Sequence, residues 1–158
     1  MIETFRAAHA HKGAAFVEIL QNCNVFNDGA FEAITGKEHR SDMLIPLHHG
    51  EPIRFGADLD RCVVADPDGR VRVTTVAEVG EDRILVHDES RTDPGLAFAL
   101  SRLARAPIEP TPIGVFRAVE RAEYVHESEL QLAAAAEQKG AGDLAALLRS
   151  GATWDVSG

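Results

Sequence analysis

The most constraining feature of the sequence is a nearly continuous apolar run at residues 14–20, Ala-Ala-Phe-Val-Glu-Ile-Leu. A run of this kind is typical of a strand that is buried on both faces of a parallel sheet. The preceding residues 3–12 carry Phe5, Ala8 and His9 at helical spacing and lead to Gly13, which predicts a helix. Helix, short link and buried strand form half of an α/β repeat, so the predicted fold class is α/β.

A buried parallel strand needs parallel neighbours, each reached through a crossover of about a dozen residues or more. The sequence after residue 20 shows no further βαβ rhythm. We therefore expect the neighbouring strands to lie before Met1 or in another polypeptide, and the chain to be the later part of a larger domain.

Short β signals follow between residues 51 and 88. Residues 66–69, Asp-Pro-Asp-Gly, fit a type I turn between runs at 62–65 and 71–76. A third run at 83–87 is expected to extend them to an antiparallel meander. In this meander three side chains are predicted to face water: Arg70, Arg72 and Thr74.

Helix signals dominate the later part of the chain. Asp93 is expected to cap a helix with Pro94 in its first turn and with one apolar stripe, made by Leu96, Ala99, Leu100 and Leu103. An extended linker is predicted from Pro107, Pro110 and Pro112. The tail from Glu127 to Arg149 is predicted to be helical, with a stop near Gly140 and Gly142 and an N-cap before the last helix.

Composition excludes several classes of protein. The chain has 16 basic and 25 acidic residues, a net charge of -9, and no basic stretch, so nucleic acid is not an expected partner. No apolar run approaches the roughly 18 residues of a membrane span, and the first residues show no signal-peptide pattern. Two cysteines at a spacing that fits no disulfide framework indicate a reducing compartment, which predicts a cytoplasmic protein.

Cys23 is the strongest candidate for chemistry. It lies between two asparagines at the carboxyl end of the predicted strand at 14–20, where open α/β sheets bind ligands. A thiolate there is able to ligate iron or to act in redox chemistry, whereas a lone cytosolic cysteine is more often a small buried hydrophobe. Because an iron-sulfur cluster takes four ligands, a cluster at Cys23 requires thiolates from outside these 158 residues.

The other polar candidates have simpler interpretations. Asn22, Asn24 and Asn27 are able to tune a metal-bound sulfur, but they equally fit turn chemistry, with Asp28 capping a short helix at 29–34. Cys62 is predicted to be a packed side chain in a β run. The histidines lack the spacing of a zinc site, both at His9 and His11 and at His48 and His49 beside Glu51.

Residues 11–31, which include Leu20-Gln21-Asn22-Cys23-Asn24-Val25-Phe26-Asn27, closely resemble the beta subunit of 2-oxoacid:ferredoxin oxidoreductases, especially bacterial forms acting on 2-oxoglutarate. The likeness covers nearly the whole chain apart from residues 57–83, and it is to the carboxyl-terminal half of the subunit only. Further matching stretches are 44–47, 49–53, 93–100, 111–117 and 142–154.

The resemblance implies the carboxyl-terminal part of a thiamine-diphosphate-binding fold, a parallel sheet with helices, plus a small antiparallel β meander and a helical tail. It divides the chain into the end of the thiamine-diphosphate-binding domain at 1–50, the meander at 51–90 and a helical and extended segment at 91–158. Cys23 matches the family's Leu-Gln-x-Cys motif, which implies that it is one ligand of a 4Fe-4S cluster. The family's other cluster cysteines and its Gly-Asp-Gly-Asp magnesium-diphosphate motif are absent from this chain, and roles are not transferred to residues 24–27, which differ from the family's Pro-Thr-Tyr-Asn.

The activity implied is oxidative decarboxylation of a 2-oxoacid such as 2-oxoglutarate to an acyl-CoA, with electrons passed to ferredoxin. Implied cofactors are thiamine diphosphate, magnesium and the cluster, and implied partners are an alpha subunit, ferredoxin, the 2-oxoacid and coenzyme A, with no membrane. No residue here is expected to be catalytic, and the chain alone is expected to be inactive. Two alternatives stay open: a non-catalytic α/β binding or structural module with Cys23 buried and inert, and a stand-alone thiol redox protein, which requires an exposed Cys23 with a lowered pKa.

Overall fold

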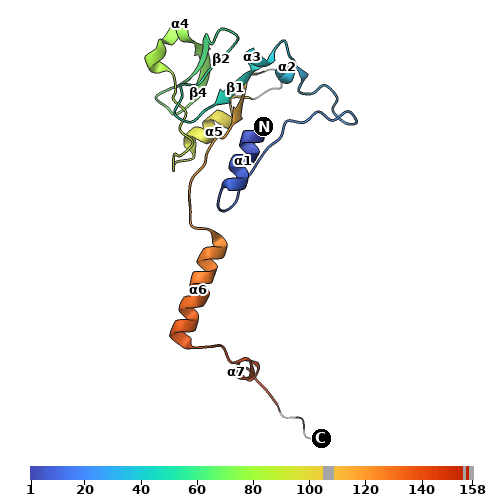
Figure 1. The fold of residues 1–158 in the computed structure, drawn as a ribbon, viewed down its shortest axis with the longest axis vertical. Coiled ribbons are helices and arrows are strands. Elements are labelled where there is room, and N and C mark those ends of the chain that lie inside the picture. Colours follow the sequence, from blue (N-terminus) through green and yellow to red (C-terminus); the bar gives the residue numbers. More distant parts are fainter. Residues whose placement is uncertain (105–108, 155, 157–158) are drawn as a thin grey trace. The chain divides into compact units, whose positions relative to one another are not determined.

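The computed structural model describes residues 1–104, 109–154 and 156. The chain separates into two compact units, Met1–Glu120 and Arg121–Gly158. Both sheets lie in the first unit, and the second contains two helices (Figure 1). The predicted division of the chain into segments 1–50, 51–90 and 91–158 stays a prediction. Pro107 of the predicted linker lies outside the described residues.

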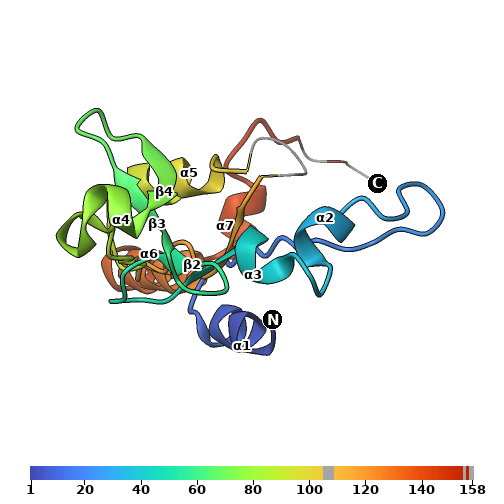
Figure 2. The same ribbon diagram turned by 90° about the horizontal axis from the view of Figure 1, so that it is seen from above.

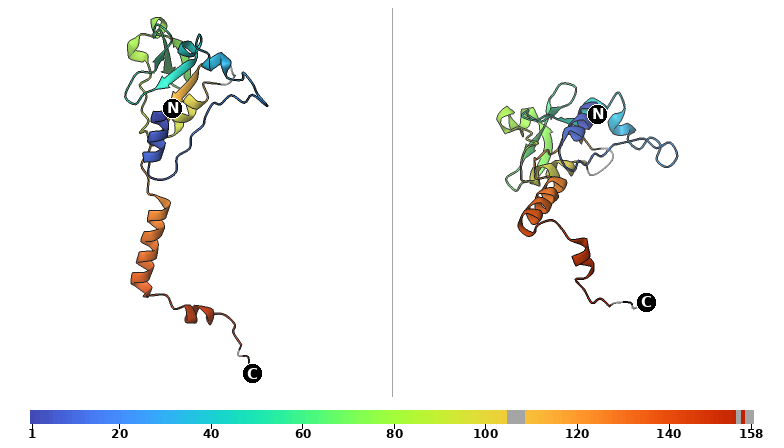
Figure 3. Two further views of the ribbon diagram at one scale, coloured as in Figure 1. Left: turned by 45° about the vertical axis from the view of Figure 1, so that its right-hand side comes forward. Right: turned by 60° about the horizontal axis from the view of Figure 1, so that its bottom comes forward.

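A two-stranded parallel sheet joins β1 (Leu44–Leu47) to β5 (Thr111–Gly114), with Leu47 opposite Gly114 (Figure 3). The sequence showed no further βαβ rhythm after residue 20, so this parallel pair was not predicted; neither of its strands pairs with residues 14–20. Each strand is four residues long and contains a proline, which leaves too short a pattern to predict a strand. The crossover between them is also not a single helix, since it includes the second sheet.

That second sheet is antiparallel and has the order β2-β3-β4, made by Arg54–Phe55, Arg61–Ala65 and Val71–Thr75. The predicted turn between β3 and β4 is confirmed, because the Gly69 amide donates to the Asp66 carbonyl at 3.0 Å. The third strand is β2 rather than the run at 83–87. Instead, a 3-10 helix, η1 (Glu81–Arg83), precedes Leu85, whose amide donates to the Val63 carbonyl.

Thr74 corrects another prediction. Its side chain was expected to face water, but the residue is only 9% exposed, and its hydroxyl donates to the Glu78 carboxylate. Glu78 lies in α4 (Val76–Val79), the short helix that directly follows β4. The Glu78 carboxylate, four residues later, thus accepts a hydrogen bond from the buried Thr74 hydroxyl. The alternation of buried and exposed residues along a strand does not predict this contact.

The predicted apolar stripe is confirmed on α5 (Gly95–Ser101). Leu100 is fully buried, with Leu96 and Leu103 packed against the same core cluster. Asp93 accepts a hydrogen bond from the Gly95 amide at 2.6 Å, although Pro94 precedes the helix rather than lying in its first turn. The remaining buried members of this cluster come from both sheets and the link between them: Ile45, Leu47, Ile53, Phe55 and Val63.

The predicted first helix is confirmed as α1 (Ile2–Ala10), which has no buried residue. The predicted strand at 14–20 is wrong for this structure: the segment runs as extended chain without strand pairing, and Phe16 is 90% exposed (Figure 2). A strand buried on both faces exists only beside neighbours, and no described residue forms a ladder with this segment.

Two short helices, α2 (Glu32–Thr35) and α3 (Arg40–Met43), lead from this segment into β1. The prediction that Asp28 caps a helix at 29–34 is wrong, since α2 begins later and its N-cap position is Phe31. The Asp28 carboxylate instead accepts a hydrogen bond from the Asn22 side chain, as described below.

The second unit contains α6 (Tyr124–Lys139) and α7 (Leu144–Leu148). Its predicted break is confirmed: α6 ends at Gly140, which has a φ of 78°, and the Asp143 carboxylate accepts from the Ala146 amide at the start of α7. A search of the described part of the chain finds no helix with the length and apolar character needed to span a membrane.

Candidate functional site

The loop that carries Cys23 spans residues 22–29 and follows the extended segment at 14–20. The side chain of Asn22 holds its two ends together. The Asn22 Nδ2 donates to Asp28 Oδ1 at 2.9 Å, and the Gly29 amide donates to Asn22 Oδ1 at 2.8 Å. Inside this closure, the Asn27 amide donates to the Cys23 carbonyl at 2.9 Å. We call the two side-chain hydrogen bonds the Asn22 bridge.

The thiol of Cys23 is partly exposed and unpaired. Hydrogen bonding from the backbone of Phe26, Val25 and Asn27 lowers the pKa of Cys23 below its ordinary value. The thiolate is the form that binds metals and attacks electrophiles, so the loop increases the reactive fraction near neutral pH. The alternative in which Cys23 is buried does not agree with this structure, and a chemical role for the thiol stays a prediction.

Large apolar side chains surround this loop and lie open to solvent. Phe26 is 91% exposed and Val25 75%, and Phe16, Ile19 and Leu20 of the preceding segment are exposed as well. Several exposed large apolar side chains in one segment are typical of a region that another protein surface or a bound group covers. Asn22, Asp28 and Gly29 also line a small polar hollow with Phe31 and residues of α2.

The donor set fits one ligand of an iron-sulfur cluster. Such a cluster is held by four thiolates, and the chain has two cysteines. Cys62 is completely buried in β3, and burial raises its pKa, which confirms its prediction as a packed side chain. Within the described residues, Cys23 is thus the thiol that remains as a candidate iron ligand.

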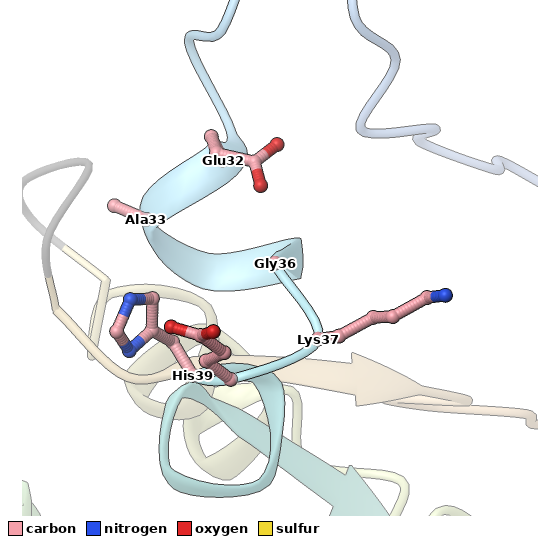
Figure 4. A pocket seen from close by; sticks show the side chains of 6 residues that line it. Glu32, Ala33, Gly36, Lys37 and His39 are labelled. Carbon is pink, nitrogen blue, oxygen red and sulfur yellow. The ribbon is translucent and has the colours of Figure 1, made fainter.

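A magnesium-diphosphate group is not matched by the residues present. Across the described ranges, no cluster of three or more His, Cys, Asp or Glu side chains is arranged to hold a metal ion. A hollow at α2 is lined by Glu32, Glu38 and His39 among others, but the described residues include no group of three such side chains that could hold a metal ion. The Lys37 side chain extends away from His39 (Figure 4). No reaction step through thiamine diphosphate is derived from this chain.

A second polar group contains His49, Asp88 and Ser90. The Ser90 hydroxyl donates to Asp88 Oδ1 at 2.6 Å, while His49 Nδ1 lies 3.7 Å from the same oxygen. Hydrogen bonds from Ser90 lower the pKa of Asp88. Because the hydroxyl contacts the carboxylate and not the imidazole, the three side chains do not form a Ser-His-Asp arrangement.

Sequence reasoning noted the residues of the loop but missed the Asn22 bridge. Asn22 and Asn24 flank Cys23 symmetrically in the sequence, and both fit turn chemistry equally well. Only the three-dimensional path of residues 22–29 brings Asp28 and Gly29 back to Asn22. The Asp-Gly pair, which favours a reversal of the chain, was the one available signal.

Comparison with known proteins supports the predicted resemblance. Over 99% of its length the chain is 44% identical to the 2-oxoglutarate oxidoreductase subunit KorB of Mycobacterium tuberculosis, and it spans 42% of that protein's length. No protein-family model and no solved structure matches the chain. The α/β architecture, with a parallel pair, a small antiparallel sheet and a helical tail, agrees with a thiamine-diphosphate-type fold. The resemblance of this chain to part of the beta subunit of 2-oxoacid oxidoreductases is confirmed.

Proposed function

We propose that the chain forms part of the beta subunit of a 2-oxoacid:ferredoxin oxidoreductase and contributes Cys23 to its 4Fe-4S cluster. The reaction is oxidative decarboxylation of 2-oxoglutarate to an acyl-CoA, with electrons passed to ferredoxin. One observation carries the proposal: a partly exposed thiol, whose pKa is lowered by backbone hydrogen bonding, in a chain 44% identical to KorB.

The count of thiols determines what else the enzyme requires. Cys23 supplies one ligand, and Cys62 is enclosed in the core of the antiparallel sheet. The other thiolates, and the groups that hold magnesium and thiamine diphosphate, therefore come from polypeptide outside these 158 residues. In this proposal an alpha subunit completes the enzyme and the chain alone is inactive. The two free cysteines favour a reducing compartment such as the cytoplasm.

The residues of this chain have defined tasks in such a site. Cys23 would bind iron through its sulfur, and backbone hydrogen bonding from Phe26, Val25 and Asn27 lowers the pKa of that thiol. A bound cluster would supply single-electron transfer. The exposed side chains of Val25 and Phe26 would exclude water once a partner surface covers them.

Replacing the ligand tests the proposal. The complete subunit, assembled anaerobically with its alpha subunit, is compared with its Cys23→Ser and Cys62→Ala variants by iron content, visible absorption and EPR. We expect Cys23→Ser to lose or strongly alter the cluster signal, and Cys62→Ala, whose side chain packs in β3, to retain it. An unchanged signal in Cys23→Ser contradicts the assignment.

The Cys23 thiol, which is partly exposed and has a lowered pKa, also supports a second function, that of a stand-alone thiol redox protein. A dithiol mechanism has no partner for Cys23 in this chain, since Cys62 is buried. To test this function, the assembled protein that contains its iron is treated with peroxide and then with dimedone. Trapping of a sulfenic acid at Cys23 favours the redox function. A metal-bound sulfur is protected from that reaction.

A further inference from the structure

We propose that residues 14–20 are a docking segment, which enters a sheet of the rest of the beta subunit as an interior strand and meets a basic side chain there through Glu18. The inference rests on the proposed function for the identity of the partner. It adds the surface through which the two parts of the subunit join and the chemistry that this surface requires.

The backbone of the docking segment is free on both edges. No backbone hydrogen bond of residues 14–21 is formed within the described part of the chain. By contrast, β3 pairs with β2 on one side and with β4 on the other. Unpaired amides and carbonyls along an extended run are a template for the addition of strands.

Both faces of the docking segment are apolar. Alternate side chains of an extended chain point to opposite faces, so Phe16 and Leu20 share one face with Glu18, and Val17 shares the other with Ile19. Phe16, Ile19 and Leu20 are exposed in this structure. A surface that covers one face leaves the other in water, so the segment fits a position inside a sheet that is covered on both sides.

A second copy of this chain does not meet that requirement. A closed pair of identical strands leaves the outer edge of each strand unpaired, and a sheet of two strands is marginally stable in water. Parallel pairing in register also places Glu18 beside Glu18, and like charges directly opposite are destabilising. The net charge of -9 on each chain adds to this repulsion.

The rest of the beta subunit is a partner of sufficient size. The chain spans 42% of the length of KorB, so more than half of a subunit of that length lies outside these residues. Strands that belong to the same polypeptide also pair at a high effective concentration. Because the loop at 22–29 begins two residues after Leu20, pairing of the docking segment also fixes the start of the loop that carries Cys23.

Glu18 determines the chemistry of the partner. It is the single charged residue in the run at 14–20, it is exposed, and no described side chain forms an ion pair with it. Enclosure in a sheet removes this carboxylate from water, and a buried charge without a partner is strongly destabilising. We therefore expect an Arg or Lys of the partner on the face that Phe16 occupies.

Hydrogen exchange tests the docking. The isolated 158-residue chain and the complete subunit are compared by mass spectrometry of peptides covering residues 14–20, with β3 as a reference that is paired in both samples. We expect exchange in the docking segment to be at least about 100-fold slower in the complete subunit, because interior strands open only in large unfolding events. Equal exchange in the two samples overturns the docking, and slow exchange in an isolated chain that has dimerised assigns the segment to a second copy instead.

Variants of Glu18 test the basic partner in the complete subunit. Glu18→Gln keeps the shape of the side chain, Glu18→Leu also removes its hydrogen bonds, and Glu137→Leu, at an exposed position of α6, is the control for adding an apolar side chain. We expect Glu18→Leu to lower the Tm by about 5 °C or more, Glu18→Gln to lower it less, and the control to change it little. A Tm in Glu18→Leu equal to or above that of wild type overturns the basic partner. If Glu18→Leu yields no folded subunit, Glu18→Gln decides, and an unchanged Tm in it has the same meaning.

The outcomes separate this inference from the proposed function. A cluster that depends on Cys23 in a subunit whose residues 14–20 exchange freely overturns the docking alone. A protected docking segment in a subunit whose cluster signal is unaffected by Cys23→Ser overturns the iron assignment and leaves the docking standing.

Discussion

Replacing Gly114 by alanine tests the close approach of β1 and β5, on which the parallel sheet depends. Gly114 lies opposite Leu47 and has a φ of 123°, which side chains other than glycine rarely adopt. A Cβ at this position meets the Leu47 carbonyl oxygen at 2.8 Å, and backbone must shift to relieve that contact. Gly69 is the matched control, since its φ is 82° but a Cβ there has no atom within 4 Å.

Both substitutions introduce backbone strain that costs about 1–3 kcal/mol of folded-state stability. Alanine has less conformational freedom than glycine in the unfolded chain, which offsets about 0.4–1 kcal/mol of that cost. Forcing a methyl group into occupied space adds about 1–3 kcal/mol at Gly114 only. We therefore expect losses in the free energy of unfolding of about 2–4 kcal/mol for Gly114→Ala and about 1 kcal/mol for Gly69→Ala. Urea unfolding of the chain, followed by far-ultraviolet circular dichroism, measures both. Equal losses refute the close approach of the two strands.

Three further changes test the core and its polar contacts. Leu100→Ala is expected to cost about 2–5 kcal/mol of unfolding free energy, because it removes a fully buried side chain, whereas Phe98→Ala on the exposed face of α5 changes little in the same urea titration. Hydrogen bonds from Thr74 and Thr75 lower the pKa of Glu78, so its stabilisation is present above the unfolded-state pKa and is lost as pH falls through the folded value. Urea midpoints measured from neutral to acidic pH are expected to fall less steeply in Glu78→Gln than in wild type; identical slopes contradict this. His87→Ala leaves the Val115 carbonyl without its 2.8 Å imidazole partner and is expected to lower the urea midpoint, which an unchanged midpoint contradicts.

Local signals in the sequence predict local structure well in this chain. The stripe that ends at Leu103, the turn at residues 66–69 and the Asp143 cap each depend on residues within one or two turns of each other, and each is confirmed. The physical cause is that helix periodicity, turn conformation and capping are satisfied by neighbours along the chain.

Predictions that depend on partners distant in the sequence fail, because a local pattern contains no information on those partners. The apolar run at 14–20 has strand composition, but a strand forms only when another strand pairs with it, and the described residues provide none. The pair formed by β1 and β5 was missed because two proline-containing runs of four residues show no β periodicity. Thr74 was assigned to the solvent face because a glutamate four residues later is invisible to strand alternation.

The candidate site shows the same limit at the level of side chains. Cys23 was singled out from its place after an apolar run and from the family motif; the structure shows a partly exposed thiol there, and its role stays a prediction. The sequence did not distinguish Asn22, which closes the loop, from Asn24, which makes no side-chain hydrogen bond in the described structure. That distinction depends on where Asp28 and Gly29 return in space.

Differential alkylation tests most directly whether the sulfur of Cys23 binds iron. The assembled, iron-loaded complex is treated anaerobically with iodoacetamide before and after chelation of its iron, and labelled peptides are quantified by mass spectrometry. We predict that Cys23 is protected while iron is bound and becomes labelled once it is removed, and that the buried Cys62 stays unlabelled in both states. Equal labelling of Cys23 before and after iron removal contradicts the account.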